Sequence, residues 1–125
     1  MDMSNDWKTD FQKEISTAKQ ARAQKNEGKS RVCARRAAGI VAKNYISDKY
    51  PDIQLMSAYE YLKYLLADPK ILEETREVVN HFIIKVTPDY FLPIDADLIE
   101  DACWLSEALL GYPCTTTTEN ETKIN

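Results

Sequence analysis

The sequence predicts an all-α fold, an antiparallel up-and-down four-helix bundle with one short additional helix. Only three glycines occur in 125 residues, and no segment alternates apolar and polar residues over the length of a strand. Apolar residues instead recur three and four positions apart, the spacing that places them on one face of a helix. A chain of this length forms a single domain with its own core, which we expect over residues 1–112.

The first helix is predicted from Asp6 to about residue 26, and Gly28 is expected to break or bend the chain after it. The second helix is predicted from about Lys29 to Lys49, because Pro51 cannot continue it. The residues of these two helices that we expect to be buried are Trp7, Phe11, Ile15, Ala18, Val32, Cys33, Ala37, Ile40, Val41 and Tyr45.

Small residues cluster in the second helix, where they are Ala34, Ala37, Ala38, Gly39 and Ala42. Such residues let a neighbouring helix approach closely, either within the bundle or across a dimer. Gly39 costs about 1 kcal/mol relative to alanine in a helix interior, so close packing would explain its presence. The first helix has matching small residues, and we expect the two helices to be in close contact there. These matching residues are Ala18, Ala21 and Ala23.

A short third helix is predicted to follow Ser57, which forms a capping box with Glu60, and to end at Ala67. Asp68 and Pro69 fit the N-cap and the first position of a fourth helix. In the third helix the expected stripe is Tyr59, Leu62, Leu65 and Leu66, whereas Tyr61 and Tyr64 are expected either to lie outward as a partner surface or to be half-buried. In the fourth it is Leu72, Val79, Ile83 and Val86, flanked by Val78 and Phe82.

Two prolines indicate a loop over residues 87–94, and Asp95 is expected to cap the last helix. That helix is predicted to end at the sequence Gly111-Tyr112-Pro113. Its expected stripe is Leu98, Ala102, Leu105 and Leu109, with Trp104 alongside. Residues 113–125 have little to bury, and we expect this tail to be disordered.

Composition excludes several classes of protein. No apolar run approaches the roughly 20 residues that cross a bilayer, and the N-terminal residues lack the apolar core of a signal peptide. We therefore expect a protein that is located in the cytoplasm and does not span a membrane. Cys33, Cys103 and Cys114 are odd in number and far apart, so neither a zinc site nor a disulfide is expected. No cofactor or metal is expected either, because no glycine-rich phosphate loop and no Glu-x-x-His pair occurs.

Charge is distributed unevenly along the chain. Residues 1–50 carry eleven Lys or Arg and six Asp or Glu, a net of +5, whereas residues 51–125 carry five and fourteen, a net of −9. This asymmetry indicates a face for an anionic partner or two halves that attract one another. The overall charge of −4 argues against a general, high-affinity nucleic-acid binder.

The basic residues of the second helix are candidates for anion binding. Arg31 and Arg35 are four residues apart and share a face, whereas Arg36 points about 100° further round, towards Lys43. Adjacent arginines beside small residues hold a phosphate or a carboxylate in forked hydrogen bonds. The alternative is that these side chains are solvated or pair with acidic residues of the second half, for which the candidates are Glu73, Glu74 and Glu77.

Two segments resemble the HEPN domain family of small bacterial and archaeal helical proteins. The sequence GKSRVCARRAAGIVAKNYI is similar to the family's second helix, which is rich in small residues and ends in a lysine with an aliphatic or aromatic pair. The sequence VTPDYFLPIDADLIEDACWLSEALL is similar to its proline-containing loop and last helix. The resemblance spans roughly residues 7–112.

This resemblance implies a bundle that dimerises, that in some members accompanies a small nucleotidyltransferase, and that in many members cleaves RNA. The ribonucleases of the family carry an arginine and a histidine separated by four to six residues. Here Arg76 is followed, after four residues, by His81, the only histidine. An imidazole can move a proton at a ribose oxygen, and a guanidinium can stabilise the phosphate, without a metal. On one continuous helix, however, the two side chains point about 140° apart.

Three hypotheses follow. The first is a HEPN-like protein, a homodimer without enzymatic activity, that binds a nucleotide, an RNA or a protein through Arg31, Arg35, Arg36 and Lys43. The second is a metal-independent endoribonuclease that uses Arg76 and His81, as the toxin of a pair with an antitoxin partner. The third is a purely structural interaction module whose charged halves pair internally.

Overall fold

The computed structural model describes residues 6–84 and 96–114. Within these ranges the chain forms five helices and no strand, which confirms the predicted all-α class. None of the described helices is both long enough and apolar enough to cross a membrane. The helices are α1 (Asp6–Ala23), α2 (Glu27–Lys49), α3 (Ala58–Ala67), α4 (Glu73–Ile83) and α5 (Leu98–Leu110).

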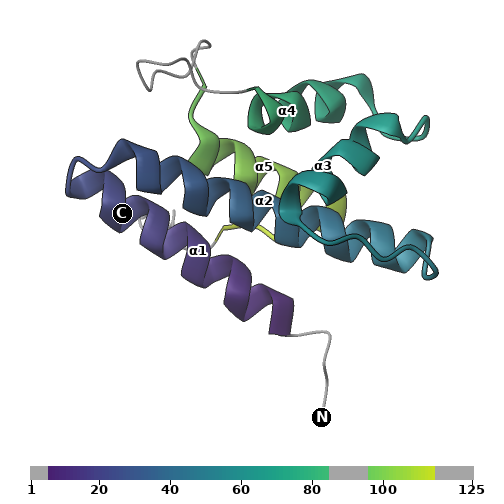
Figure 1. Cartoon of the computed structure of the whole chain (residues 1–125), viewed down its shortest axis with the longest axis horizontal. Coiled ribbons are helices and arrows are strands. Elements are labelled where there is room, and N and C mark those ends of the chain that lie inside the picture. The colour runs from purple at the N-terminus through teal and green to yellow at the C-terminus, as the bar shows by residue number, and fades with distance from the viewer. Residues whose placement is uncertain (1–5, 85–95, 115–125) are drawn as a thin grey trace, which may run out of the picture.

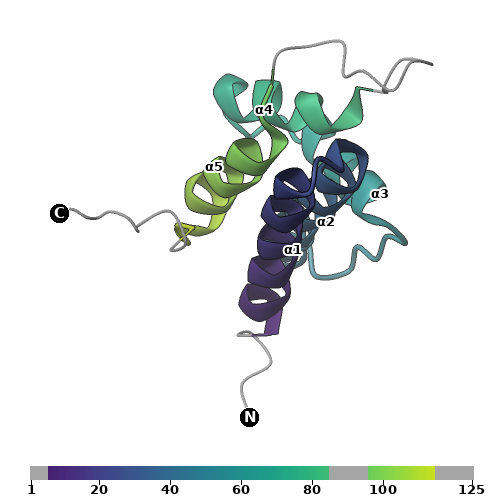
Figure 2. The ribbon, with the colours of Figure 1, turned by 90° about the vertical axis from the view of Figure 1, so that its left-hand side faces the viewer.

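Helix α2 is the central element of the fold (Figure 1). It packs against α1, α3 and α5, and α4 in turn packs against α3 and α5. In Figure 1 helix α2 lies between α1 and α4, and Figure 2 shows α4 above both α1 and α2. The largest side chains that are fully buried come from all five helices: Phe11, Ile15, Val41, Ile46, Leu62, Leu65, Val79, Phe82, Leu98 and Leu105.

The small residues of α2 allow two neighbours to approach closely. The contact between α1 and α2 is the most extensive in the described chain, as predicted, and Ala18 and Ala21 of α1 are buried, whereas Ala23 is exposed. Gly39 serves a different neighbour. A Cβ atom built on Gly39 would lie 2.2 Å from the Cβ and 2.8 Å from the Cα of Ala58, the first residue of α3.

The turn between α1 and α2 differs from the prediction. Helix α1 ends at Ala23, and Asn26 caps α2 by accepting a hydrogen bond from the Lys29 backbone at 3.2 Å. Lys25 takes the positive φ of 64° in the turn. Gly28, expected to break the chain, lies instead in the first turn of α2, because the amide of Asn26 satisfies the free N–H there.

The predicted junction between α3 and α4 is also wrong. Asp68 is the C-cap of α3, and its carboxylate accepts the backbone N–H of Lys70 at 2.9 Å instead of capping α4. Helix α4 begins at Glu73, after a turn. At the other end of α3, Ser57 accepts the Glu60 N–H as predicted, but the Glu60 carboxylate takes the N–H of Met56 at 2.7 Å.

Helix α5 is capped by Asp97, whose carboxylate accepts the backbone N–H groups of Ile99 at 3.1 Å and Glu100 at 3.3 Å. The predicted cap, Asp95, lies outside the described residues, as do the loop over residues 87–94 and Val86. Gly111 ends α5 as predicted, with a φ of 67° that favours glycine.

Several predictions of burial are reversed in the structure. Tyr61, expected to lie outward or to be half-buried, is buried, whereas Tyr59, predicted to pack, is 41% exposed. Val32 and Leu72, both placed on buried stripes, are 43% and 72% exposed. The hydroxyl of Tyr61 accepts the backbone N–H of Leu55 at 3.1 Å, so this polar tip has a partner within the fold.

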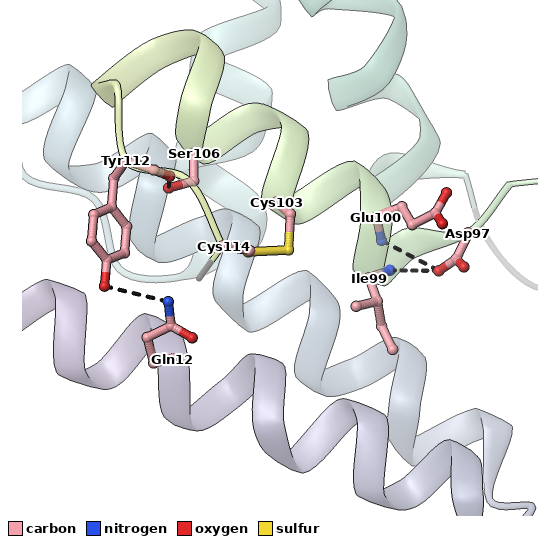
Figure 3. Close-up of a disulfide and its surroundings, with 8 residues drawn as sticks. All are labelled: Gln12, Asp97, Ile99, Glu100, Cys103, Ser106, Tyr112 and Cys114. Atoms are coloured by element: carbon pink, nitrogen blue, oxygen red, sulfur yellow. Dashed lines mark hydrogen bonds between the residues drawn. A yellow bond between two sulfur atoms is a disulfide. The ribbon is translucent and has the colours of Figure 1, made fainter. Parts of the chain in front are cut away.

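A disulfide joins Cys103 of α5 to Cys114, which contradicts the expectation that none forms (Figure 3). The turn at Gly111 brings the chain back along α5, so that two cysteines 11 residues apart meet. Cys114 is only 6% exposed. The ordered chain therefore continues past residue 112, where the tail was predicted to begin, and residues 115–125 lie outside the described part.

Candidate ligand-binding groove

A groove of about 970 Å³ lies between the N-terminal half of α2, the start of α3 and the end of α4. We call it the α2–α4 groove. Volumes of about 300–1,000 Å³ are typical of small-molecule sites. Three parts of the chain line the groove. The turn before α2 and the start of α2 contribute residues 25–28, Arg31, Val32 and Arg35. The start of α3 contributes Tyr59, and the end of α4 contributes Phe82, Ile83 and Ile84.

Arg35 connects this groove to the end of α4. Its Nε atom donates a hydrogen bond to the carbonyl oxygen of Phe82 at 2.9 Å. The last carbonyls of a helix have no partner within the helix, so this bond satisfies one of them. The two terminal nitrogens of the guanidinium, Nη1 and Nη2, take no part in this bond.

Among the described residues, Arg35 is half-buried beside the cation Arg31 and forms no ion pair with a carboxylate. Burial lowers the pKa of Arg35 below its usual value, and the positive charge of Arg31 lowers it further. Both causes disfavour the charged guanidinium, which nevertheless stays protonated because its pKa is so high. An anion bound between Arg31 and Arg35 would therefore be stabilised by both charges.

Arg22 differs from Arg35 because it is paired with two carboxylates and has a structural role. Arg22 donates hydrogen bonds to the carboxylates of Glu27 at 2.9 Å and Asp97 at 3.0 Å, and these bonds raise the pKa of Arg22, with Glu27 the larger cause. Glu27 also lines the α2–α4 groove. Because Arg22 pairs with this carboxylate, Glu27 does not offset the charge of Arg35.

The four predicted anion-binding residues form two groups in the structure. Arg31 and Arg35 line the groove, whereas Arg36 and Lys43 are exposed on another face of α2. Helical geometry separates Arg36 from Arg35 by about 100° and brings Lys43 within about 20° of Arg36. The structure therefore brings together half of the predicted set.

Arg76 is engaged with the backbone at the end of α3. Its Nη1 donates to the carbonyl of Leu66, and its Nη2 donates to the carbonyls of Asp68 at 3.3 Å and Ile71 at 3.4 Å. The Glu73 carboxylate, a candidate partner for α2, lies 3.4 Å from Nε of Arg76. Arg76 thus joins the end of α3 to α4.

His81 faces a different helix. Its Nδ1 lies 2.9 Å from the Oδ2 of Asp101 on α5, and both side chains are partly exposed. A carboxylate in this position orients the imidazole and fixes which nitrogen carries the proton. Arg76 and His81, predicted as a catalytic pair, are therefore held by separate sets of contacts, on α3 and on α5. Among the residues described, no three His, Cys, Asp or Glu side chains are placed to hold a metal ion.

Sequence reasoning missed the apolar part of the groove. Val32, Tyr59 and Ile83 were assigned to the core, and all three line the groove. One signal was present in the sequence. Val32 lies three residues before Arg35 and about 100° from Arg31, so its exposed side chain stands beside these arginines and away from the buried stripe.

These contacts define an all-α protein with a groove that is apolar on one side and carries two guanidinium groups on the other. Comparison with protein-family models, with curated proteins and with solved structures finds no match to this chain.

Proposed function

We propose that this protein binds a small anionic ligand in the α2–α4 groove, with Arg31 and Arg35 contacting the negative group. The observation that carries the proposal is the state of Arg35. Its guanidinium is half-buried beside a second guanidinium, and its pKa is lowered by burial and by Arg31. Forked hydrogen bonds from arginines to a carboxylate or phosphate are among the strongest in proteins.

The geometry and charge of the groove suit a small ligand better than an RNA. An RNA-binding surface requires a track of positive charge along the nucleic-acid backbone. Here Arg36 and Lys43 lie on a different face from Arg31 and Arg35, and the whole chain carries a net charge of −4. Of the ligands expected from the sequence, a nucleotide is small enough for the groove and carries a negative group that Arg31 and Arg35 would contact.

The matched pair Arg35→Gln and Arg36→Gln tests this function. The two arginines are adjacent and the charge change is the same, but only Arg35 lines the groove. We expect the dissociation constant for whichever of AMP or dodecanoate binds to rise at least tenfold in Arg35→Gln, since a hydrogen bond to a charged group contributes about 1.5–3 kcal/mol. In Arg36→Gln it should change less than about twofold. Isothermal titration calorimetry measures both.

Arg35→Lys serves as a second variant, because it keeps the charge and loses the fork. An intermediate loss of affinity is expected, with the native circular dichroism spectrum retained. Failure of both probes to bind the wild-type protein, or equal losses in the Arg35 and Arg36 variants, contradicts the proposal.

The finer architecture is part of the same proposal. We infer a HEPN-like, up-and-down four-helix arrangement for this chain. We propose that the chain forms a cytoplasmic homodimer and that the homodimer associates with a nucleotidyltransferase. The close packing of α1 and α3 on the small residues of α2 supports the helical arrangement within the chain.

The ribonuclease hypothesis requires Arg76 and His81 to act on one phosphate. Because Arg76 is hydrogen-bonded to the backbone of α3 and the following turn, we expect no metal-independent cleavage of RNA. Total RNA should stay intact when it is incubated in EDTA with the wild-type protein, and equally intact when it is incubated with the His81→Ala variant. Cleavage by the wild-type protein that His81→Ala abolishes would restore the enzymatic hypothesis.

A further inference from the structure

We propose that the ligand of the α2–α4 groove is an amphipathic carboxylate, an unesterified fatty acid, whose carboxylate lies at Arg31 and Arg35 and whose aliphatic chain lies against the apolar wall. This inference rests on the proposed function and names its ligand class. It depends on how polar and apolar side chains are divided within the groove.

The head group has a defined place. Arg31 and Arg35 are one helical turn apart on the same face of α2, so both guanidinium groups can reach one carboxylate. The neighbouring carboxylate of Glu27 is paired with Arg22 at 2.9 Å. Arg31 and Arg35 therefore place two guanidinium groups on one side of the groove, and Lys25 also lines it, which suits an anionic head group.

The rest of the groove is apolar. Val32 of α2 and Tyr59 of α3 are 43% and 41% exposed there, and Ile83 and Ile84 at the end of α4 are half-buried. Large apolar side chains exposed together around a groove mark a site that an apolar partner covers. Their burial by a ligand would contribute about 25 cal/mol per Å² of apolar surface.

A nucleobase fits this wall less well than an aliphatic chain. The edge of a base carries several donors and acceptors, and leaving them without partners in an apolar site reduces affinity. The phenol oxygen of Tyr59 is the side-chain polar atom among the residues of α3 and α4 that line the groove. A hydrocarbon chain has no such requirement, and a volume of about 970 Å³ accommodates one of medium length.

Chain length gives the sharpest test. Titration calorimetry with octanoate, decanoate and dodecanoate, each below its micelle concentration, should show the dissociation constant falling about fourfold per CH₂. Dodecanoate should bind more tightly than AMP. Arg35→Gln should weaken all three fatty acids by the same factor, because they share the head group.

A second matched pair tests the wall. Val32 lines the groove, whereas Leu72, which is 72% exposed, does not. Val32→Ser should weaken dodecanoate at least about threefold and leave octanoate less affected, while Leu72→Ser should leave both unchanged. Both positions are exposed, so neither substitution opens a cavity in the core.

The outcomes separate this inference from the proposed function. Binding of AMP that depends on Arg35 and is as tight as that of dodecanoate overturns the fatty-acid inference and leaves the anion groove in place. Affinity that does not depend on chain length also overturns it. Absence of binding by every probe overturns both.

Discussion

Replacing Gly39 by valine is expected to lower the free energy of unfolding by about 3 kcal/mol or more. The first atom of any side chain at this position meets Ala58, with its Cβ at 2.2 Å and its backbone Cα at 2.8 Å. Backbone cannot rotate away as a flexible side chain can, so α3 must shift as a unit. Urea unfolding followed by circular dichroism measures the loss.

Gly28→Ala is the matched control in the same helix. A Cβ at Gly28 has its nearest neighbour at 3.9 Å, the side-chain oxygen of Asn26. This variant should be as stable as the wild type or more stable by up to about 1 kcal/mol, because alanine favours the helix. In Gly39→Ala, the added substitution Ala58→Gly should recover part of the loss, since it removes the nearer of the two clashing atoms. A Gly39→Val protein as stable as Gly28→Ala would contradict the close approach of α2 and α3.

Loss of the disulfide is expected to lower the free energy of unfolding by about 3 kcal/mol. The bond closes a loop between residues 11 apart in sequence, which restricts the unfolded chain. It also keeps the turn after α5 on the fold. There the Tyr112 ring lies 5.3 Å from Trp7 and 6.1 Å from Phe11, and its hydroxyl accepts a bond from Gln12 (Figure 3).

The measurement is urea unfolding with and without dithiothreitol. The double variant Cys103→Ser, Cys114→Ser should unfold at the lower urea concentration of the reduced wild type and should not respond to the reductant. Cys33→Ala is the control, because this buried free thiol is outside the bridge and its variant should keep the full response. A wild-type protein whose unfolding midpoint is the same in both conditions would show that the bridge contributes nothing.

The disulfide bears on the predicted cytoplasmic location. Cellular reductants keep most cysteines of cytosolic proteins as thiols, whereas oxidising compartments preserve disulfides. In the cytosol the stability supplied by the Cys103–Cys114 pair would therefore be absent, and the turn at Tyr112 would be held by its aromatic contacts and hydrogen bonds alone. The location of the protein stays a prediction.

The sequence predicted the helices well and the turns between them less well. Periodic apolar residues such as Phe11, Ile15 and Ala18 indicate a helix wherever they stand, because their burial depends on the 3.6-residue repeat. Caps are decided by single hydrogen bonds. The carboxylate of Asp68 was as suitable for starting α4 as for the turn after α3, and only the packing of α3 against α4 selects between them.

The sequence predicted two of the residues that line the groove, Arg31 and Arg35, as candidates for anion binding. In the structure Arg35 lies three and seven residues before Ala38 and Ala42, which are both fully buried, so it lies at the edge of the inner face of α2. The sequence predicted that Arg35 shares a face with Arg31, but not that this face lies against the end of α4. The sequence also gives no indication that the end of α4 lies opposite Arg35, because its residues Phe82, Ile83 and Ile84 are nearly fifty positions away in the chain. Likewise, the spacing of Arg76 and His81 gives no indication that α3 and α5 supply their partners.

The sequence by itself determined the helical class, the apolar stripes and the grouping of Arg31 with Arg35, since each follows from the repeat of a single helix. Only the tertiary structure decided that Gly39 meets Ala58, that Cys103 reaches Cys114, and that a half-buried guanidinium faces the end of α4. These contacts join residues from different elements. Their energies depend on distances of a few ångströms that the order of residues along the chain does not specify.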